Sequence, residues 1–538
     1  MNNARLTALS IKNFKSYRDE VTIPLAPLTI IVGPNNSGKS SLIQALLLLK
    51  QTLLDPNGYI PLKLDGLVDA FDLRELTFGC PESNQEKPVT GPSFHLEWEC
   101  PINMETALNK VGLNKNLSHL AEKSGIDWIE GATSNESLTS KTKLKIHTET
   151  LQGSTRFSIL EITVTIPEKS RESYLLRILP NDKDGPVEWQ KQKTRKIQVE
   201  YDHFIPYLRI DRSRVGPRLT ERAWHDAYLI LFEQPLETLK QIIQNLHYLG
   251  SHRAVPSSLF KHATTDPLEI GASGEFAAQI LHRKQSEIIH FLPTLELSED
   301  GSTIQPHSKV QALPLVEAVN RVMRSLSIHP PLSIKDHGVG FQLLFGDANI
   351  PHVGKGLSCL LPLVQLGLFA DPLRFSGERG EMTLEEYLEQ CDSYSHIAIE
   401  EPEAHLHPKV ASRLAHFLVS QAMAKRQFII ETHSDHLVRR LRGLIARAEP
   451  GGELESWLLE NVRILNVSCV DGCSKVEVNH LTRDGWIDEH WPADFMDESS
   501  NEESAIYFAK LEKKDTPVAI NSAITLLDGD EPEDEATL

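Results

Sequence analysis

The stretch LTIIVGPNNSGKSS, from Leu28 to Ser41, decides the fold of this 538-residue chain. Its first residues, Leu28–Val32, form a continuous apolar and β-branched run, which is typical of a buried central strand. The next residues, Gly33–Ser40, fit the pattern G-x-x-x-x-G-K-[ST] in full, and a stretch of helical character follows them. A strand, a glycine-bearing loop and a helix in this order predict a phosphate-binding loop (P-loop) in an α/β protein.

The residue types of this loop suit a nucleotide. Glycine lets the backbone approach phosphate without a clash from a Cβ atom, and the amides of the loop and of the helix N-terminus face the anion. Lys39 can place its charge against the β- and γ-phosphates, and Ser40 can offer its hydroxyl to Mg²⁺. We therefore expect ATP and Mg²⁺ here, rather than a chance glycine turn before a helix. The expected contacts are Gly33, Asn35, Asn36, Ser37, Gly38, Lys39, Ser40 and Ser41.

Two carboxylates end a second short apolar strand, Ile397–Ile399, far along the chain. One carboxylate at the end of a strand can hold Mg²⁺, and the next can polarise an attacking water. Because adjacent strand residues point to opposite faces, the two carboxylates are expected to have different roles. We assign Glu400 to the metal and Glu401 to the general base. The alternative is a solvated acidic turn.

A third apolar strand, Phe428–Ile430, is followed by Glu431, Thr432 and His433. A lone histidine is more often structural than functional. The position of His433 just past a buried strand favours a contact with the γ-phosphate or with the attacking water. We therefore predict His433 to be catalytic, together with Glu401 and Lys39.

Composition narrows the class of protein. The chain carries 55 Lys and Arg against 74 Asp and Glu, a net charge of −19. This balance excludes a uniformly basic nucleic-acid binder but leaves room for a local basic groove. The six cysteines show no paired C-x-x-C spacing, which disfavours a disulfide scaffold or a zinc module. With no secretory signal and no apolar run of about 18 residues, we expect a cytoplasmic protein without a membrane span.

The rest of the chain alternates between β-rich and helical patterns. Residues 93–201 show the alternation of strands, interrupted at 131–142 by a Ser-, Thr- and Asn-rich stretch that predicts a mobile loop. Helical periodicity returns near Ala223. Further helices are expected at 236–246, 274–291, 314–327, 356–370 and 410–424, and a strand at 339–345. The acidic end of the chain, from Asp528 to Glu535, predicts a solvated tail.

Four of these motifs together carry a resemblance to a known family. They are IKNFKSY (Ile11–Tyr17), GPNNSGKSS (Gly33–Ser41), IEEPEAHLHP (Ile399–Pro408) and IETHSDH (Ile430–His436). In this order they resemble ABC-type, SMC-like ATPases, and within that group the single-chain ATPases related to the overcoming-lysogenization-defect (OLD) proteins. The resemblance implies an α/β fold: an ABC-type ATPase head with a mixed sheet around the P-loop, split by a β-rich and helical insertion.

The resemblance also implies a division of the chain into segments. Residues 1–215 would form an N-terminal ATPase lobe with the P-loop and a β-rich extension, and residues 216–330 a helical insertion. Residues 331–447 would form the C-terminal ATPase lobe, and residues 448–538 a C-terminal extension with the acidic tail. Residues 248–253 and 484–495 resemble segments of one bacterial subgroup.

A further segment, Val353–Pro362, resembles the signature motif of the family. The resemblance implies that Gly356 and Ser358 contact the γ-phosphate bound by a partner subunit. Cys359 stands where relatives often have Gln. In the family, two heads dimerise head-to-tail around two ATP molecules, so a homodimer or higher homo-oligomer is implied.

Stand-alone members of this family often belong to bacterial antiphage systems, such as the Septu-type PtuA ATPases, which also occur with retrons. The resemblance thus implies a regulatory ATPase that controls a separate effector such as an HNH nuclease. A retron reverse transcriptase and its nucleic acid are further implied partners. The resemblance implies no association with a membrane. No Toprim-type nuclease pattern follows His433, so the chain is not expected to be the nuclease itself.

Three other functions compete with this interpretation. A DNA-repair or chromosome-associated SMC-like ATPase would need long helical arms and a basic path, for which the basic runs at 191–196 and 209–222 are candidates. An ABC transporter subunit would carry an LSGGQ motif, which this sequence lacks. A scaffold that binds ATP without hydrolysing it would not need Glu401 and His433.

Overall fold

A computed structural model describes residues 4–82, 87–111, 117–133, 136–169, 172–180, 186–190, 192–194, 197–210, 219–262, 267, 269–297, 303–377 and 380–487. The chain divides into two compact units, Met1–Trp491 and Pro492–Leu538. The predicted acidic tail, and residues 488–495 at the end of the subgroup-like segment, lie outside the described residues. Within the described ranges, no helix is both long and apolar enough to cross a membrane.

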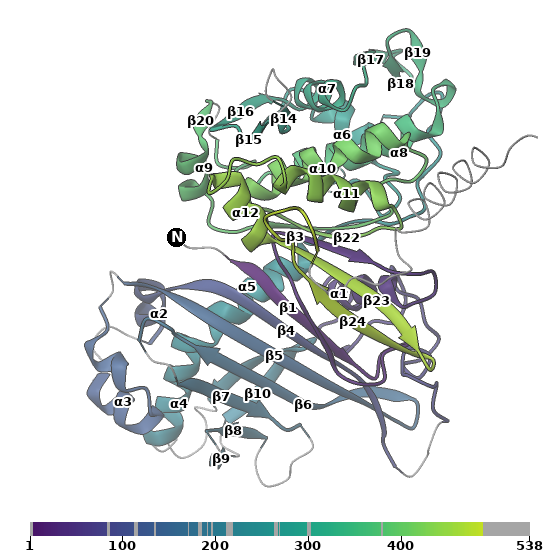
Figure 1. Cartoon of the computed structure of the whole chain (residues 1–538). Helices are drawn as coiled ribbons and strands as arrows, with labels where there is room; N and C mark the ends of the chain where they lie inside the picture. The colour runs from purple at the N-terminus through teal and green to yellow at the C-terminus, as the bar shows by residue number, and fades with distance from the viewer. Residues whose placement is uncertain are drawn as a thin grey trace, which may run out of the picture. The chain divides into compact units, whose positions relative to one another are not determined.

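A six-stranded sheet forms the centre of the first unit (Figure 1). Its strands, in spatial order, are β12 (His247–Leu249), β21 (Ser395–Glu400), β22 (Arg426–Glu431), β3 (Leu28–Val32), β23 (Val462–Val470) and β24 (Cys473–Asn479). The first five are parallel, and β24 is antiparallel to β23. All residues of β3 are buried, which confirms the predicted central strand. Because the carboxyl ends of parallel strands meet at one edge, a ligand site is expected there.

The two faces of this core sheet are covered differently. Ile31, Ala398 and Ile429 belong to a large apolar core that also includes residues of α1 (Lys39–Leu53). On the other face, Gly367 of α8 (Lys355–Phe369) lies against Phe428 and against Phe417 of α10 (Pro408–Met423). Figure 1 shows α8, α10 and α11 (Asp435–Ile445) on one side of the core sheet and α1 on the other. The P-loop strand is therefore enclosed by helices on both faces.

An eight-stranded antiparallel sheet packs beyond α1. Its order is β2 (Val21–Pro24), β1 (Arg5–Lys12), β4 (Val89–Asn103), β5 (Ser137–Leu151), β6 (Ser154–Thr165), β7 (Ser173–Ile178), β8 (Val187–Trp189) and β9 (Gln192–Thr194). It is joined by β10 (Ile197–Asp202), β11 (Ile205–Ile210), α2 (Met104–Val111), α3 (Leu117–Ser124), α4 (Leu219–Leu231) and α5 (Glu233–Gln244). This confirms the β-rich pattern and the helices expected after Ala223 and at 236–246.

The loop predicted at 131–142 is wrong in its second half. Strand β5 begins at Ser137, and its residues are buried alternately. Ser140 is fully buried and donates its hydroxyl to the Cys100 carbonyl at 3.1 Å. Polar composition suggested a loop here, but small hydroxyl side chains can satisfy their hydrogen bonds inside a sheet.

The remaining elements lie on the α8–α10 side of the core sheet. They are α6 (Ala277–Arg283), β13 (Ile288–Phe291), β14 (Glu296–Leu297), β15 (Ile304–Gln305), β16 (Lys309–Pro314), α7 (Leu315–Ser325), β17 (Leu332–Asp336), β18 (Phe341–Phe345), β19 (Ala348–Asn349), β20 (Met382–Thr383), α9 (Leu384–Gln390) and α12 (Glu453–Asn461). The helix expected at 274–291 stops at Arg283, because the apolar run Ile288–Phe291 pairs with β16 as a strand instead. The helices expected at 314–327, 356–370 and 410–424 and the strand at 339–345 are present, with slightly different ends.

The core sheet draws strands from all four of the expected segments. Strand β12 comes from 216–330, the segment expected to be a helical insertion. Strand β23 comes from 448–538, the expected extension, yet it pairs directly with β3. The physical reason is that the fully buried Ile464 and Leu465 complete the apolar interior beside the P-loop strand.

Candidate nucleotide-binding site

The P-loop runs from the end of β3 to the start of α1, and its glycines are required by close packing. Gly33 has φ +143°, and a Cβ atom there would lie 2.1 Å from the Val467 carbonyl oxygen. Gly38 has φ +100°, and a Cβ atom there would lie 2.4 Å from the Ser474 hydroxyl. Strands β23 and β24 therefore press against the loop and leave no room for side chains at these positions.

Hydroxyl groups from distant segments hold the loop in shape. Ser474 donates to the Ser37 carbonyl at 2.6 Å and lies 2.6 Å from the Ser16 hydroxyl. Tyr17 donates to the Gly38 carbonyl at 3.1 Å. Two carbonyls of the loop are thus engaged by the protein, as expected for a turn whose amides face an anion.

Lys39 lies between the loop and a group of carboxylates. Its side chain is buried, and its Nζ donates to the Pro34 carbonyl at 2.6 Å. Burial lowers the pKa of Lys39, while the nearby Glu431 and Glu401 raise it. A cation that is desolvated and close to carboxylates is suited to exchange its carbonyl partner for a phosphate.

Ser40 contacts a carboxylate to which the sequence assigned no role. Its hydroxyl donates to Oε1 of Glu431 at 2.8 Å. Oε2 of Glu431 is buried and has no hydrogen-bond partner among the described residues. Burial, as the largest cause, raises the pKa of Glu431 to about 7. A hydroxyl and a carboxylate with one oxygen left over are ligands that Mg²⁺ prefers, so these residues fit the expected ion.

The expected metal residue, Glu400, has other partners. Its Oε2 accepts the Ser251 amide at 3.3 Å, and it also hydrogen-bonds with the Tyr248 hydroxyl. Strand order explains the difference, since β22 is the direct neighbour of β3 whereas β21 is one strand further away. At about 4.8 Å per strand, a carboxylate at the end of β22 is the one in reach of Ser40. The structure therefore places Glu431 on the Ser40 hydroxyl in place of Glu400.

Glu401 marks the point at which β21 turns away from the sheet. It has a left-handed φ of 45°, and its amide donates to the Glu431 carbonyl at 2.8 Å. The Glu401 carboxylate influences the pKa of Lys39 and of His433, so these groups lie together at the strand ends. Backbone strain in a non-glycine residue commonly marks a functional position.

His433 is exposed at the rim of this group. Its amide donates to Oε1 of Glu403 at 2.9 Å. Burial and the charge of Lys39 lower the pKa of His433, whereas Glu401 raises it. The structure thus gathers Lys39, Ser40, Glu401 and His433 at one edge of the sheet, as the sequence predicted.

Gly356 and Ser358 lie in the first turn of α8, with different neighbours. A Cβ atom on Gly356 would lie 2.5 Å from the His405 carbonyl, in the turn that follows Glu401. The Ser358 hydroxyl contacts the Ile350 carbonyl at 3.5 Å. Gly356 therefore lies against the turn after β21, whereas Ser358 contacts Ile350, shortly before α8. Neither contact is with the P-loop of the same chain.

Arg253 is a residue of this region that sequence reasoning missed. Its Nη2 donates to the Glu400 carbonyl at 2.9 Å, while Nε and Nη1 are buried without a partner among the described residues. Burial lowers its pKa, although Cys359 and Glu400 raise it. In the sequence, residues 248–253 show only a resemblance to a subgroup of the family. Nothing in the local sequence shows that β12 pairs with β21, and this pairing is what brings Arg253 to Glu400.

Comparisons with known proteins agree with this geometry. Residues 5–229 match a family model described as an AAA ATPase domain, and residues 350–439 match one described as an AAA domain, putative AbiEii toxin, Type IV TA system. Both parts of the site thus lie in stretches that match models of AAA-type ATPase domains. The first match covers the P-loop, and the second covers Glu400, Glu401 and His433.

Among solved structures, three SMC heads align with most of this chain at low identity and low TM-score. One is an Smc head bound to the C-winged helix domain of ScpA, with 14% identity over 89% of this chain and 98% of that chain and a TM-score of 0.36. Another is the SMC head domain from Thermotoga maritima, with 12% identity, coverage of 88% and 98%, and a TM-score of 0.33. A third, an Smc head with an extended coiled coil bound to the C-terminal domain of ScpA, derived from Pyrococcus furiosus, has 14% identity, coverage of 95% and 100%, and a TM-score of 0.33. No curated protein matches the chain. The α/β class follows from the core sheet and its P-loop.

The contact between Ser40 and Glu431 leads to a first prediction. Glu431→Gln should raise the Mg²⁺ concentration needed for ATP binding about 10- to 100-fold, because a charged partner contributes about 1.5–3 kcal/mol. A Mg²⁺ titration of ATP binding at fixed ATP measures the shift. Glu400→Gln is the matched comparison; a large shift there and none for Glu431→Gln would return the metal role to Glu400.

Proposed function

We propose that this protein is an ATP-hydrolysing switch of the SMC-like, ABC type. The observation that carries the proposal is the convergence of Lys39, the Ser40–Glu431 pair and Glu401 at the carboxyl edge of one parallel sheet. A P-loop alone would support only binding. A carboxylate beside the P-loop lysine, on a strained turn, adds a group that can activate water.

The arrangement assigns a step to each side chain. Lys39 binds the β- and γ-phosphates, and Ser40 with Glu431 would hold Mg²⁺, which neutralises developing charge on the phosphates. Glu401 accepts a proton from water as the water oxygen bonds to the γ-phosphorus. The bond from that phosphorus to the bridging oxygen breaks, giving ADP and inorganic phosphate. His433 stands at the rim, where it can stabilise the departing phosphoryl group.

Dimerisation head-to-tail is part of the proposal. Gly356 lies against the turn that follows Glu401. The buried Arg253 donates to the Glu400 carbonyl and lies near enough to Cys359 for the two side chains to interact electrostatically. A partner's nucleotide bound at Ser358 would therefore act on the same turn that holds the general base. Binding energy that differs between open and closed dimers is what lets ATP drive such a switch.

The output of the switch is proposed to be a separate effector in bacterial antiphage defence, such as an HNH nuclease. The description of the second matching family, which names a putative toxin of a Type IV TA system, supports this direction. The net charge of −19 makes proteins more natural partners than bulk DNA. OLD-type, Septu-type or retron-associated ancestry belongs to this same proposal.

The decisive experiment slows hydrolysis and asks what ATP assembles. The Glu401→Gln variant, mixed with ATP, should form a dimer that captures the products of the adjoining genes in co-purification. A variant that stays monomeric with saturating ATP would reject the switch. A dimer that captures no neighbouring gene product would retain the switch and reject the effector.

A second candidate, an SMC-like ATPase acting on DNA, is favoured by one cluster of arginines. Two adjoining cavities, each of about 320 Å³, share Thr294, Glu296, Arg324 and Ser325. Arg321 and His329 line one of them, and Arg413, His416 and Arg440 line the other. Among the described residues, Arg413 bonds to the Ser325 carbonyl and Arg440 to His416. No ion pair with a described carboxylate is formed by Arg321, Arg324, Arg413 or Arg440. Such unneutralised guanidinium groups suit phosphates.

The basic runs at 191–196 and 209–222, which the sequence offered as a DNA path, give less support to DNA binding than the arginine cluster does. Lys191, Arg195, Lys196, Arg212, Arg214 and Arg218 lie outside the described residues. Arg209 is paired with Glu200 at 3.2 Å, so its charge is already compensated. The arginine cluster is therefore the better test of DNA binding.

The double variant Arg321→Gln, Arg324→Gln should weaken binding to duplex DNA uniformly across sequences. Each lost phosphate contact lowers the slope of log affinity against log salt by about 1, so a fall of about 2 is expected. Salt titrations followed by fluorescence anisotropy measure it. Arg209→Gln is the control because its charge is paired. An unchanged slope in the double variant would remove this second candidate.

A further inference from the structure

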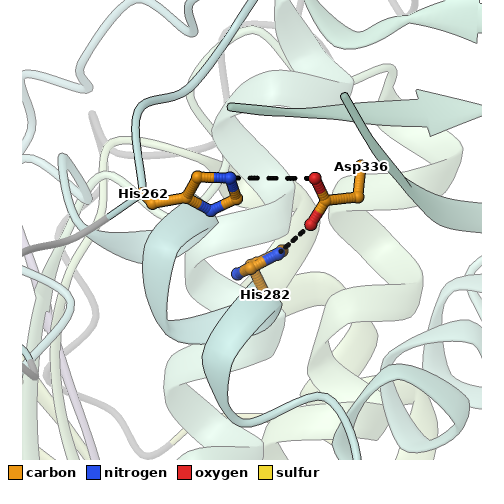
Figure 2. Close-up of side chains that lie close together, drawn as sticks. All are labelled: His262, His282 and Asp336. Atoms are coloured by element: carbon orange, nitrogen blue, oxygen red, sulfur yellow. Dashed lines mark hydrogen bonds and ion pairs between the residues drawn. The ribbon is translucent and has the colours of Figure 1, made fainter. Parts of the chain in front are cut away.

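Three side chains that the nucleotide site does not use lie close together on a different part of the surface. His262 lies in the segment that follows β12, His282 is on α6, and Asp336 ends β17. Figure 2 shows the two imidazole rings facing the carboxylate from separate elements. Nε2 of His282 lies 3.3 Å from Oδ2 of Asp336, and Nε2 of His262 lies 3.7 Å from Oδ1. One ligand atom from each residue lies within 4.8 Å of the others.

The surroundings hold this group in place without a ligand. The His282 ring stacks on Phe341, with centroids 4.2 Å apart and an interplanar angle of 17°. Oδ1 of Asp336 accepts the Gly338 amide at 2.8 Å. Phe260 and Phe341 exchange two backbone hydrogen bonds of 2.9 Å, which fixes the chain just before His262.

Only one of the two histidines, His282, is hydrogen-bonded to the carboxylate, so hydrogen bonds alone do not close the cluster. A 3.7 Å separation between His262 and Asp336 is too long for a hydrogen bond. Ligand atoms bound at about 2.0–2.2 Å around a tetrahedral ion stand roughly 3.3–3.6 Å apart. One ligand atom from each of the three residues already lies within 4.8 Å of the others, so a bound ion would draw these atoms somewhat closer together. Two imidazoles with one carboxylate select Zn²⁺ and similar transition metals over Mg²⁺ and Ca²⁺, which prefer oxygen ligands alone.

We propose that His262, His282 and Asp336 form a transition-metal site of the Zn²⁺ class, with one coordination position left to water. The site is chemically distinct from the oxygen-lined Ser40–Glu431 pair. Three protein ligands and a water are the usual set of an accessible zinc site. Binding of the metal does not depend on the proposed ATPase function.

The position of the site gives the metal a structural consequence. The segment that carries His262 begins beside Glu400, where Ser251 and Arg253 bond to Glu400. The strand that ends at Asp336 leads through the β18–β19 hairpin to η2 (Ile350–His352) and then to Ser358. Asn349 also donates to the Ser258 carbonyl at 2.7 Å. A bound metal would therefore clamp together the two segments that border the candidate nucleotide site and the signature-like helix.

Co²⁺ is the probe, because its visible absorption reports tetrahedral coordination by nitrogen ligands. The full chain, stripped with EDTA and free of nucleotide, is titrated with CoCl₂ and then with ZnCl₂. We expect one Co²⁺ per chain with tetrahedral bands that Zn²⁺ abolishes. His282→Ala and the double variant His262→Ala, Asp336→Asn should lose these bands.

Two controls keep the outcome interpretable. His337→Ala, next in sequence to Asp336 and hydrogen-bonded to Gln342, should keep the bands, and so should Glu431→Gln. Circular dichroism and melting of the EDTA-treated variants check that they are folded like the EDTA-treated wild type. Absence of tetrahedral bands in the wild type, or their survival in a folded double variant, overturns the site.

Discussion

Glu401→Gln should lower the rate of ATP hydrolysis about 10²- to 10⁴-fold, the usual contribution of a general base. The substitution keeps the size and hydrogen-bonding ability of the side chain but removes its ability to accept a proton. It also leaves the Glu401 amide free to keep its 2.8 Å bond to the Glu431 carbonyl. ATP affinity should therefore change little, and the enzyme should stall with ATP bound.

The stalled protein should be a dimer. If ATP closes two heads and hydrolysis opens them, slowing hydrolysis raises the closed population without changing the affinity of closure. Light scattering should show a doubling of mass for the variant with ATP, and a monomer with ADP. Glu389→Gln, at an exposed position on α9, is the matched control and should hydrolyse ATP normally. Normal hydrolysis by Glu401→Gln would show that another group activates the water, with Glu403 the next carboxylate to test.

The sequence predicted those parts of the site that are contiguous in the chain. Strand, loop and helix from Leu28 to Leu53 follow one another directly, so local pattern and motif identified them together. Glu401 and His433 were predicted for a similar reason, because each lies within a few residues of the end of a short apolar strand. What local pattern leaves open is which strands are neighbours in the sheet.

That missing information explains why Glu431, and not the expected Glu400, lies on the Ser40 hydroxyl. Glu400 and Glu431 look alike in sequence, since each is the last residue of a parallel strand. Only the order β21-β22-β3 shows that Glu431 is the nearer one to Ser40. Arg253 was missed for the same reason, because the segment that carries it follows β12, which pairs with β21 across a long stretch of chain.

The two elements that the sequence predicted wrongly both form strands of a sheet with buried residues. Ser140 lies in a polar stretch and is nevertheless fully buried, because hydrogen bonding inside the sheet compensates for its hydroxyl. Ile288–Phe291 continues a helical pattern but forms a strand, because a partner strand is available at 309–314. In both cases tertiary pairing overrides local propensity.

Lys39→Ala should lower ATP affinity about 100-fold, since a charge-assisted bond to phosphate contributes up to about 3 kcal/mol. The lysine Nζ is already held inside the loop by the Pro34 carbonyl at 2.6 Å, so little side-chain freedom remains to be lost when it turns to a phosphate. Alanine at the first residue of α1 is a good helix former, so the fold should be preserved.

Calorimetric titration with ATP and Mg²⁺ measures the loss for Lys39→Ala, and thermal melting without nucleotide confirms that the variant is folded. Lys12→Ala, which removes an exposed lysine at the end of β1, controls for the change in net charge. Because Lys39 is also flanked by Glu401 and Glu431, its removal leaves uncompensated carboxylates facing the phosphates. The variant should therefore bind ATP less tightly than loss of a single contact implies. A folded Lys39→Ala protein that binds and hydrolyses ATP like the wild type would place the nucleotide somewhere other than this loop.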